Sequence, residues 1–152
     1  MLEEQQFAEA IVRFIRSFGL HRPDRTPCGI EAGVAEAHAL SELSTGRLRQ
    51  MDLVERLSLS KSTVSRLVDG MVERGWVERG RVPSDGRGVL LALTPAGSDV
   101  ARRLARARRD RFRALLAAVP EERRSDLIDV LRIMEEAARV SDAKHPRALE
   151  RA

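Results

Sequence analysis

Residues 53–75, LVERLSLSKSTVSRLVDGMVERG, decide the fold. Apolar residues recur at helical spacing in a short segment, Gln50–Leu57, and again from Ser60 to about Arg74. The stretch Ser58–Ser60 interrupts this spacing, and the Ser60 hydroxyl suits an N-cap because it can accept from an unpaired backbone N–H. Two short helices joined by three or four residues predict a helix-turn-helix.

A β-hairpin is expected directly after the second of these helices. Gly75 ends the helix, and the β-leaning segments Trp76–Val82 and Val89–Leu93 flank the turn-forming sequence PSDGRG at residues 83–88. A hairpin in this position is a wing. We expect Trp76, at its base, to pack against the core rather than stack on a base.

Helices are predicted on both sides of this lobe. Apolar stripes mark a first helix at Glu3–Phe18, a second from about Ile30 to Leu43 and a last one from Pro120 to about Val140. Thr94 and Pro95 open a long helix that continues to about Val119, with Thr94 as N-cap and proline in the first turn. The fold class is therefore mainly α (α+β): a winged helix-turn-helix with N- and C-terminal dimerisation helices.

Residues 1–152 are expected to form a single domain. The winged helix-turn-helix lobe would span 30–94, and the segments 1–20 and 95–142 would be the dimerisation helices. The first and last helices carry apolar stripes that one lobe of this size could not fully cover, which predicts a homodimer.

Composition narrows the class of protein. The chain has 152 residues, a net charge of +4 and a pI near 10.4, which indicates a polyanionic partner only weakly. No apolar run is long enough to cross a membrane, and the N-terminus lacks the order of a secretory signal, so we expect a cytoplasmic protein. With Cys28 as the single cysteine, the sequence has no multi-cysteine metal site.

The second helix of the pair carries the predicted DNA contacts. Its polar face combines hydroxyls, which hold phosphates, with basic side chains, which hold phosphates and, in arginine, also bind guanine edges. The helix N-terminus adds unpaired N–H groups for a phosphate. A solvated, serine-rich helix face is the alternative. The predicted contacts are Ser60, Lys61, Ser62, Thr63, Ser65 and Arg66.

The wing adds three arginines, Arg79, Arg81 and Arg87, and one acidic residue, Asp85. An arginine at a hairpin tip can enter the minor groove, so Arg87 is predicted to bind there. Asp85 either orients that guanidinium or only forms the turn.

Three motifs in register resemble the MarR family. They are the helix pair quoted above, the D-x-R of Asp85 and Arg87 in the wing, and LALTPAG at residues 91–97. The resemblance implies an obligate dimer whose wings straddle a palindrome on double-stranded DNA, and a repressor released by a small anionic or aromatic effector. Arg49 departs from the family pattern, because a Thr or Ser often caps the first helix of the pair there.

In this family the effector crevice lies between the dimer lobe and the DNA lobe. Here that would place Phe18, His38 and Met51 near the effector. Peroxide-sensing members use a cysteine in the first helix with tyrosine partners. Cys28 lies elsewhere and the chain has no tyrosine, so redox sensing is an alternative we do not favour.

Other classes of function are not expected. The sequence has no nucleophile–base pair, glycine-rich phosphate loop or histidine pair at ligand spacing, so we predict no enzyme, no metal and no cofactor. A winged helix that has lost DNA binding and binds protein instead is disfavoured by the basic and hydroxyl face. The seven arginines between Arg102 and Arg113 are interpreted as a solvated helix face, with phosphate or ligand contact as the alternative.

Overall fold

The computed structural model describes residues 2–81 and 88–144. The chain forms two compact units, residues 1–111 and 112–152, with the long helix α5 passing from the first into the second. In chain order the elements are α1 (Leu2–Phe18), α2 (Val34–Leu43), β1 (Leu48–Arg49), α3 (Gln50–Leu57), α4 (Lys61–Glu73), β2 (Val77–Arg81), β3 (Val89–Leu93), α5 (Pro95–Ala117), the 3-10 turn η1 (Glu121–Arg123) and α6 (Arg124–Lys144).

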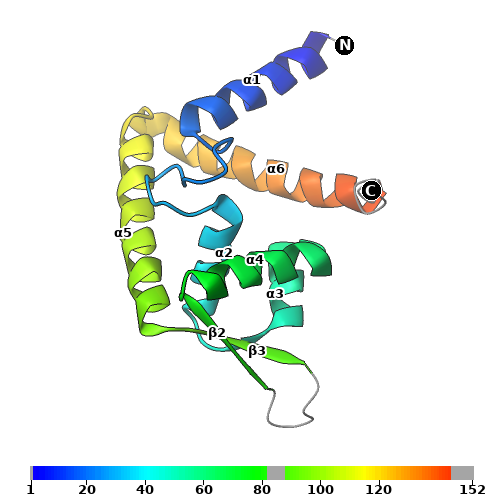
Figure 1. Cartoon of the computed structure of the whole chain (residues 1–152). Helices are drawn as coiled ribbons and strands as arrows, with labels where there is room; N and C mark the ends of the chain where they lie inside the picture. The colour runs from blue at the N-terminus through cyan, green and yellow to red at the C-terminus, as the bar shows by residue number, and fades with distance from the viewer. Residues whose placement is uncertain (1, 82–87, 145–152) are drawn as a thin grey trace. The chain divides into compact units, whose positions relative to one another are not determined.

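The predicted helix-turn-helix is formed by α3 and α4 (Figure 1). Helix α3 ends at Ser58, whose φ of 52° lies in the left-handed region and turns the chain toward α4. The two helices share a core with α2 and β3, and its largest fully buried side chains come from all four elements. These are Leu40, Leu53, Val64, Val68, Met71 and Leu91.

The wing is part of a three-stranded antiparallel sheet in the order β1–β3–β2. Strand β2 pairs with β3 from Val77 opposite Leu93 to Arg81 opposite Val89. Strand β1, which pairs Leu48 with Leu91, was not predicted from the sequence. Two residues are too few to show the alternating pattern that marks a strand, although the buried Leu48 ties this strand to the core.

Helix α5 packs closely against the base of the wing. The Thr94 hydroxyl accepts from the Gly97 backbone N–H at 3.0 Å, so the predicted N-cap is confirmed. A Cβ on Gly97 would lie 1.9 Å from the Trp76 carbonyl oxygen, so only glycine allows this approach. Trp76 itself is half-buried and packs against the core, as predicted.

The second helix begins later than expected, at Val34 rather than near Ile30. Residue Gly33 is the N-cap, and its backbone N–H donates to the Glu36 carboxylate at 2.8 Å. The preceding residues form a tight turn in which the buried Thr26 hydroxyl accepts from the Ile30 N–H at 3.1 Å. These local hydrogen bonds therefore replace the helix at 30–33.

Helices at the two ends of the chain leave large apolar side chains exposed. On α1 these include Phe7 and Phe14, and on α6 they include Leu131 and Ile133, which is 68% exposed. Among the described residues, no helix is both long and apolar enough to span a membrane.

Candidate nucleic-acid interface

The N-terminus of α4 is closed by the side chain predicted to close it. The Ser60 hydroxyl accepts from the Thr63 backbone N–H at 3.1 Å, and lies 2.8 Å from the Thr63 hydroxyl and 3.1 Å from the Ser62 hydroxyl. This cap satisfies one of the unpaired N–H groups of the first turn and leaves others facing outward. The end of α4 thus combines hydroxyls with backbone donors, which is the chemistry that holds a phosphate.

The outer face of α4 carries two basic side chains. Both Lys61 and Arg66 are exposed, and neither forms an ion pair with a described residue. On the opposite face Val64 and Val68 are completely buried, which fixes the rotation of the helix about its axis. The buried face thereby holds the charged face outward, with Ser62 exposed beside it and Thr63 and Ser65 half-buried.

The wing arginines have different surroundings. Arg79 forms an ion pair with Asp69 of α4 at 2.6 Å, so it connects the wing to the helix. Arg81 is exposed at the end of β2. Asp85 and Arg87 lie outside the described residues, and their predicted roles stay predictions.

A network that the sequence reasoning missed holds the C-terminal end of α4. The Arg74 guanidinium donates to the Glu31 carbonyl at 2.7 Å and to the Glu36 carboxylate at 3.1 Å. It also lies 3.7 Å from the centre of the Trp76 ring, within the range of a cation–π contact. One side chain thus joins the segment before α2, the end of α4 and the base of the wing. A basic residue at a helix C-terminus was the only sequence signal for it.

The first helix of the pair is capped without a hydroxyl at the N-cap position. Arg49 makes no side-chain cap, and its backbone N–H instead donates to the Asp52 carboxylate at 3.2 Å. The departure from the family pattern at Arg49 is therefore compensated three residues later.

The arginines of α5 differ in their contacts. Arg102 pairs with Asp99, and Arg108 donates to the Ser41 hydroxyl at 3.3 Å. Arg111 lies 5.3 Å from the centre of the Phe18 ring. The exposed face predicted from the sequence accounts for Arg103, Arg106 and Arg109.

The three residues proposed for the effector crevice have different surroundings. Phe18 is buried and lines a cavity of about 270 Å³, whereas neither His38 nor Met51 is among its lining residues, and both are exposed. The guanidinium-bearing residues around this cavity are Arg16, Arg22, Arg25 and Arg111.

Cys28 is half-buried in the turn before α2. Its sulfur lies 3.1 Å from the Thr26 hydroxyl. In the part of the chain that the structure describes, no three metal-ligating side chains come close enough together to hold a metal ion.

The winged lobe is similar in sequence to known proteins. Residues 33–88 match a family model described as MarR family. The multiple antibiotic resistance protein MarR of Salmonella typhimurium is 36% identical over 55 residues, covering 36% of this chain and 38% of that protein. MarR of Escherichia coli strain K12 is 40% identical over 50 residues, covering 33% and 35%. The alignment thus spans less than two fifths of the length of these curated relatives.

Similarity of structure extends over most of the chain. The PcaV transcriptional regulator from Streptomyces coelicolor superposes with a TM-score of 0.73 at 26% identity, covering 87% of this chain and 96% of that chain. The winged lobe of this chain matches the MarR family. The same regulator in complex with its natural ligand gives a TM-score of 0.68 at 26% identity, covering 87% and 91%.

The match of residues 33–88 to the MarR family model confirms the resemblance drawn from the three motifs. The structural similarity to PcaV confirms the winged helix-turn-helix flanked by terminal helices. Members of the MarR family are transcriptional regulators that bind DNA. This agrees with the expectation that the chain is not an enzyme.

Proposed function

We propose that this chain is a homodimeric repressor that binds palindromic double-stranded DNA through α4 and the wing and is released by a small effector. The observation that carries the proposal is the N-terminal half of α4. There a Ser60-capped helix end, backbone donors and two exposed basic side chains without ion-pair partners among the described residues form one surface. Such a surface complements a phosphate backbone and, through Arg66, the edge of a guanine.

Within this surface, the predicted contacts divide into two groups. Lys61, Ser62 and the free N–H groups of the first turn would bind phosphates, because they form the end of the helix. Arg66, one turn further along, would lie over base edges. Arg79 would act mainly by holding the wing against α4 through Asp69. From the sequence, Arg81 and Arg87 would follow the backbone and the minor groove, with Asp85 orienting Arg87.

The proposal of a homodimer is supported by the exposed apolar residues of α1 and α6. A soluble monomer would leave these faces in water, whereas a second copy would remove them from it. In this arrangement residues 30–94 form the DNA-binding lobe of a single 1–152 domain, and 1–20 and 95–142 supply the dimerisation helices. From a function on DNA we also infer that the protein acts in the cytoplasm.

The proposal of an anionic effector is supported by the cavity at Phe18. Four arginines surround a buried aromatic ring, so an aromatic acid would find both an apolar face and positive charge there. The similarity to PcaV, which has been solved with its natural ligand, agrees with an effector-controlled regulator.

Selection from a random pool of duplex DNA tests the function directly. The purified chain should enrich a palindrome, and that palindrome should be bound by two protomers. Enrichment of no sequence above background would refute the proposal. A screen of phenolic acids for release of the selected DNA tests the effector, and Arg22→Gln should weaken the response of any active compound.

A further inference from the structure

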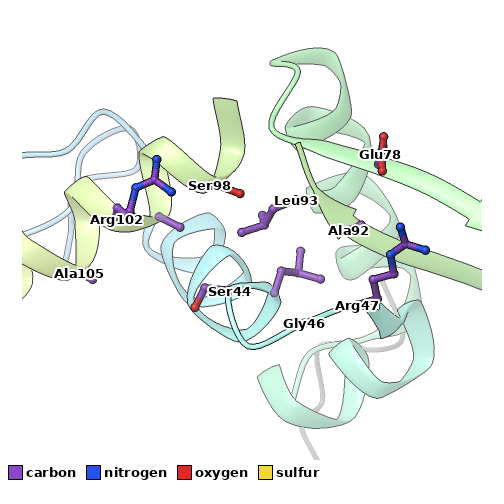
Figure 2. A pocket seen from close by; sticks show the side chains of 11 residues that line it. Ser44, Gly46, Arg47, Glu78, Ala92, Leu93, Ser98, Arg102 and Ala105 are labelled. Carbon is purple, nitrogen blue, oxygen red and sulfur yellow. The ribbon is translucent and has the colours of Figure 1, made fainter. Parts of the chain in front are cut away.

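A second cavity, of about 450 Å³, lies in the winged lobe and shares no residue with the cavity at Phe18. It lies between the C-terminal end of α2, strands β2 and β3, and the first turns of α5 (Figure 2). The space exists because the chain places small residues where these elements meet. The small lining residues are Ser44, Gly46, Ala92, Ser98, Ala101 and Ala105.

The lining combines an apolar floor with a charged rim. Leu93 lies in the middle of the cavity, with Arg102 at one end and Arg47 at the other (Figure 2), and Leu43 also lines it. Arg102 is already paired with Asp99. The Arg47 guanidinium is exposed and forms no ion pair with a described residue. The cavity therefore offers one unpaired positive charge beside an apolar surface.

Glu78 restricts the charge that this cavity accepts. Its position on β2 is opposite Ala92 of β3, and both residues line the cavity. A ligand with two negative groups would bring one of them toward this carboxylate, and like charges repel at short range. The rim thus favours a single negative charge near Arg47.

We propose that this cavity binds a small planar monocarboxylate. Its apolar body would lie on Leu43 and Leu93, and its carboxylate would accept two hydrogen bonds from the Arg47 guanidinium, the geometry that arginine offers best. The volume falls within the range of about 300–1,000 Å³ that is typical of small-molecule sites. An occupant would contact both the segment leading into β1 and α3 and the two wing strands. Binding here does not depend on the DNA-binding function proposed above.

Titration of the ¹⁵N-labelled full chain with benzoate, followed by NMR, tests this proposal. The expected result is saturable shifts of the backbone amides of Gly46, Arg47, Glu78 and Ala92. Benzamide has the same shape without the charge, and should bind at least about tenfold more weakly, a difference of about 1.4 kcal/mol.

Two variants separate this cavity from the other one. Arg47→Gln should weaken the benzoate-induced shifts at Glu78 and Ala92 at least tenfold, and Ala105→Leu should abolish them by filling the space. Arg22→Gln, which changes only the cavity at Phe18, should leave these shifts unchanged. Absence of shifts at these amides, equal binding of benzamide, or an unaffected response in Arg47→Gln would overturn the proposal.

Discussion

The winged lobe buries large apolar side chains, whereas the terminal helices leave several of theirs exposed. In the lobe, Leu53, Val64 and Val68 have no exposed surface, so this part of the chain closes its own core. On α1 and α6, Phe7 is 57% exposed and Leu131 is 54% exposed. Because burial of apolar surface is the main favourable contribution to folding, the lobe is stabilised by contacts within itself. The terminal helices need a further surface, which we propose is a second copy of the chain.

The largest effect is expected on the free energy of unfolding, from a substitution that leaves a cavity in the core of the lobe. Leu53→Ala should lower the free energy of unfolding by about 2–5 kcal/mol, because it removes a fully buried side chain that the surroundings cannot replace. The matched control is Met51→Ala, two residues earlier on the same helix and 46% exposed, which should cost about 0.5 kcal/mol or less. Urea unfolding at a fixed protein concentration measures both. Equal losses for the two variants would mean that the lobe core is not as the structure shows it.

A charge on the exposed apolar face of α6 should have the next largest effect, on assembly rather than on folding of the lobe. Ile133→Glu would bury a carboxylate without a partner in the dimer, at a cost of about 2 kcal/mol or more. The dimer dissociation constant should therefore rise roughly thirtyfold or more. Sedimentation over a concentration series measures this, with Glu135→Gln as a control at an exposed polar position of the same helix. A monomeric parent protein at micromolar concentration would refute the role assigned to these helices.

Truncation of Arg66, on the outer face of α4, should weaken DNA binding and leave the free energy of unfolding unchanged. Arg66→Ala should weaken binding to the selected DNA site by about 1–3 kcal/mol and relax base preference at one position in each half-site. The control is Arg56→Ala on α3, whose guanidinium pairs with Glu42 at 2.9 Å. That variant should retain the base preference. Binding measured at one salt concentration for both variants distinguishes them, and equal specificity in Arg66→Ala would remove α4 from base contact.

Removal of the cap of α4 should have the smallest effect. Ser60→Ala removes the acceptor of the Thr63 N–H and should destabilise the lobe by about 1 kcal/mol. Ser62→Ala removes a neighbouring hydroxyl that, within the described residues, contacts the Ser60 hydroxyl and no backbone group, and should change stability by less than about 0.5 kcal/mol. Thermal unfolding resolves this difference. A larger loss in Ser62→Ala would contradict the assignment of the cap.

Local interactions are the part of this structure that the sequence predicts well. The caps at Ser60 and Thr94 and the bounds of α3 and β3 depend on residues within four positions of each other, and each was predicted. The short strand β1 depends on a partner elsewhere in the chain, so no local pattern marks it. The start of α2 at Val34 was placed too early although its hydrogen bonds are local, because the apolar pattern does not show them.

The same distinction applies to the candidate site. The residues of α4 could be named because one helix face carries them all. The pair between Arg79 and Asp69 and the contacts of Arg74 with Glu31 and Glu36 could not, because they join residues ten to forty-three positions apart. Such pairs are determined by the angles at which the hairpin and helices meet. The cavity at Arg47 was missed for the same reason, since its lining comes from four separate elements.

The central claim, that this chain binds a specific DNA sequence, is tested most directly by its affinity for the selected palindrome and for a scrambled duplex of the same composition. Fluorescence anisotropy at physiological salt should give an affinity for the palindrome at least about 10³-fold higher. Raising the salt concentration should lower both binding constants. The logarithm of each constant should fall against the logarithm of the salt concentration with a slope of about −0.9 for each neutralised phosphate. Equal affinity for the two duplexes at physiological salt would contradict the claim.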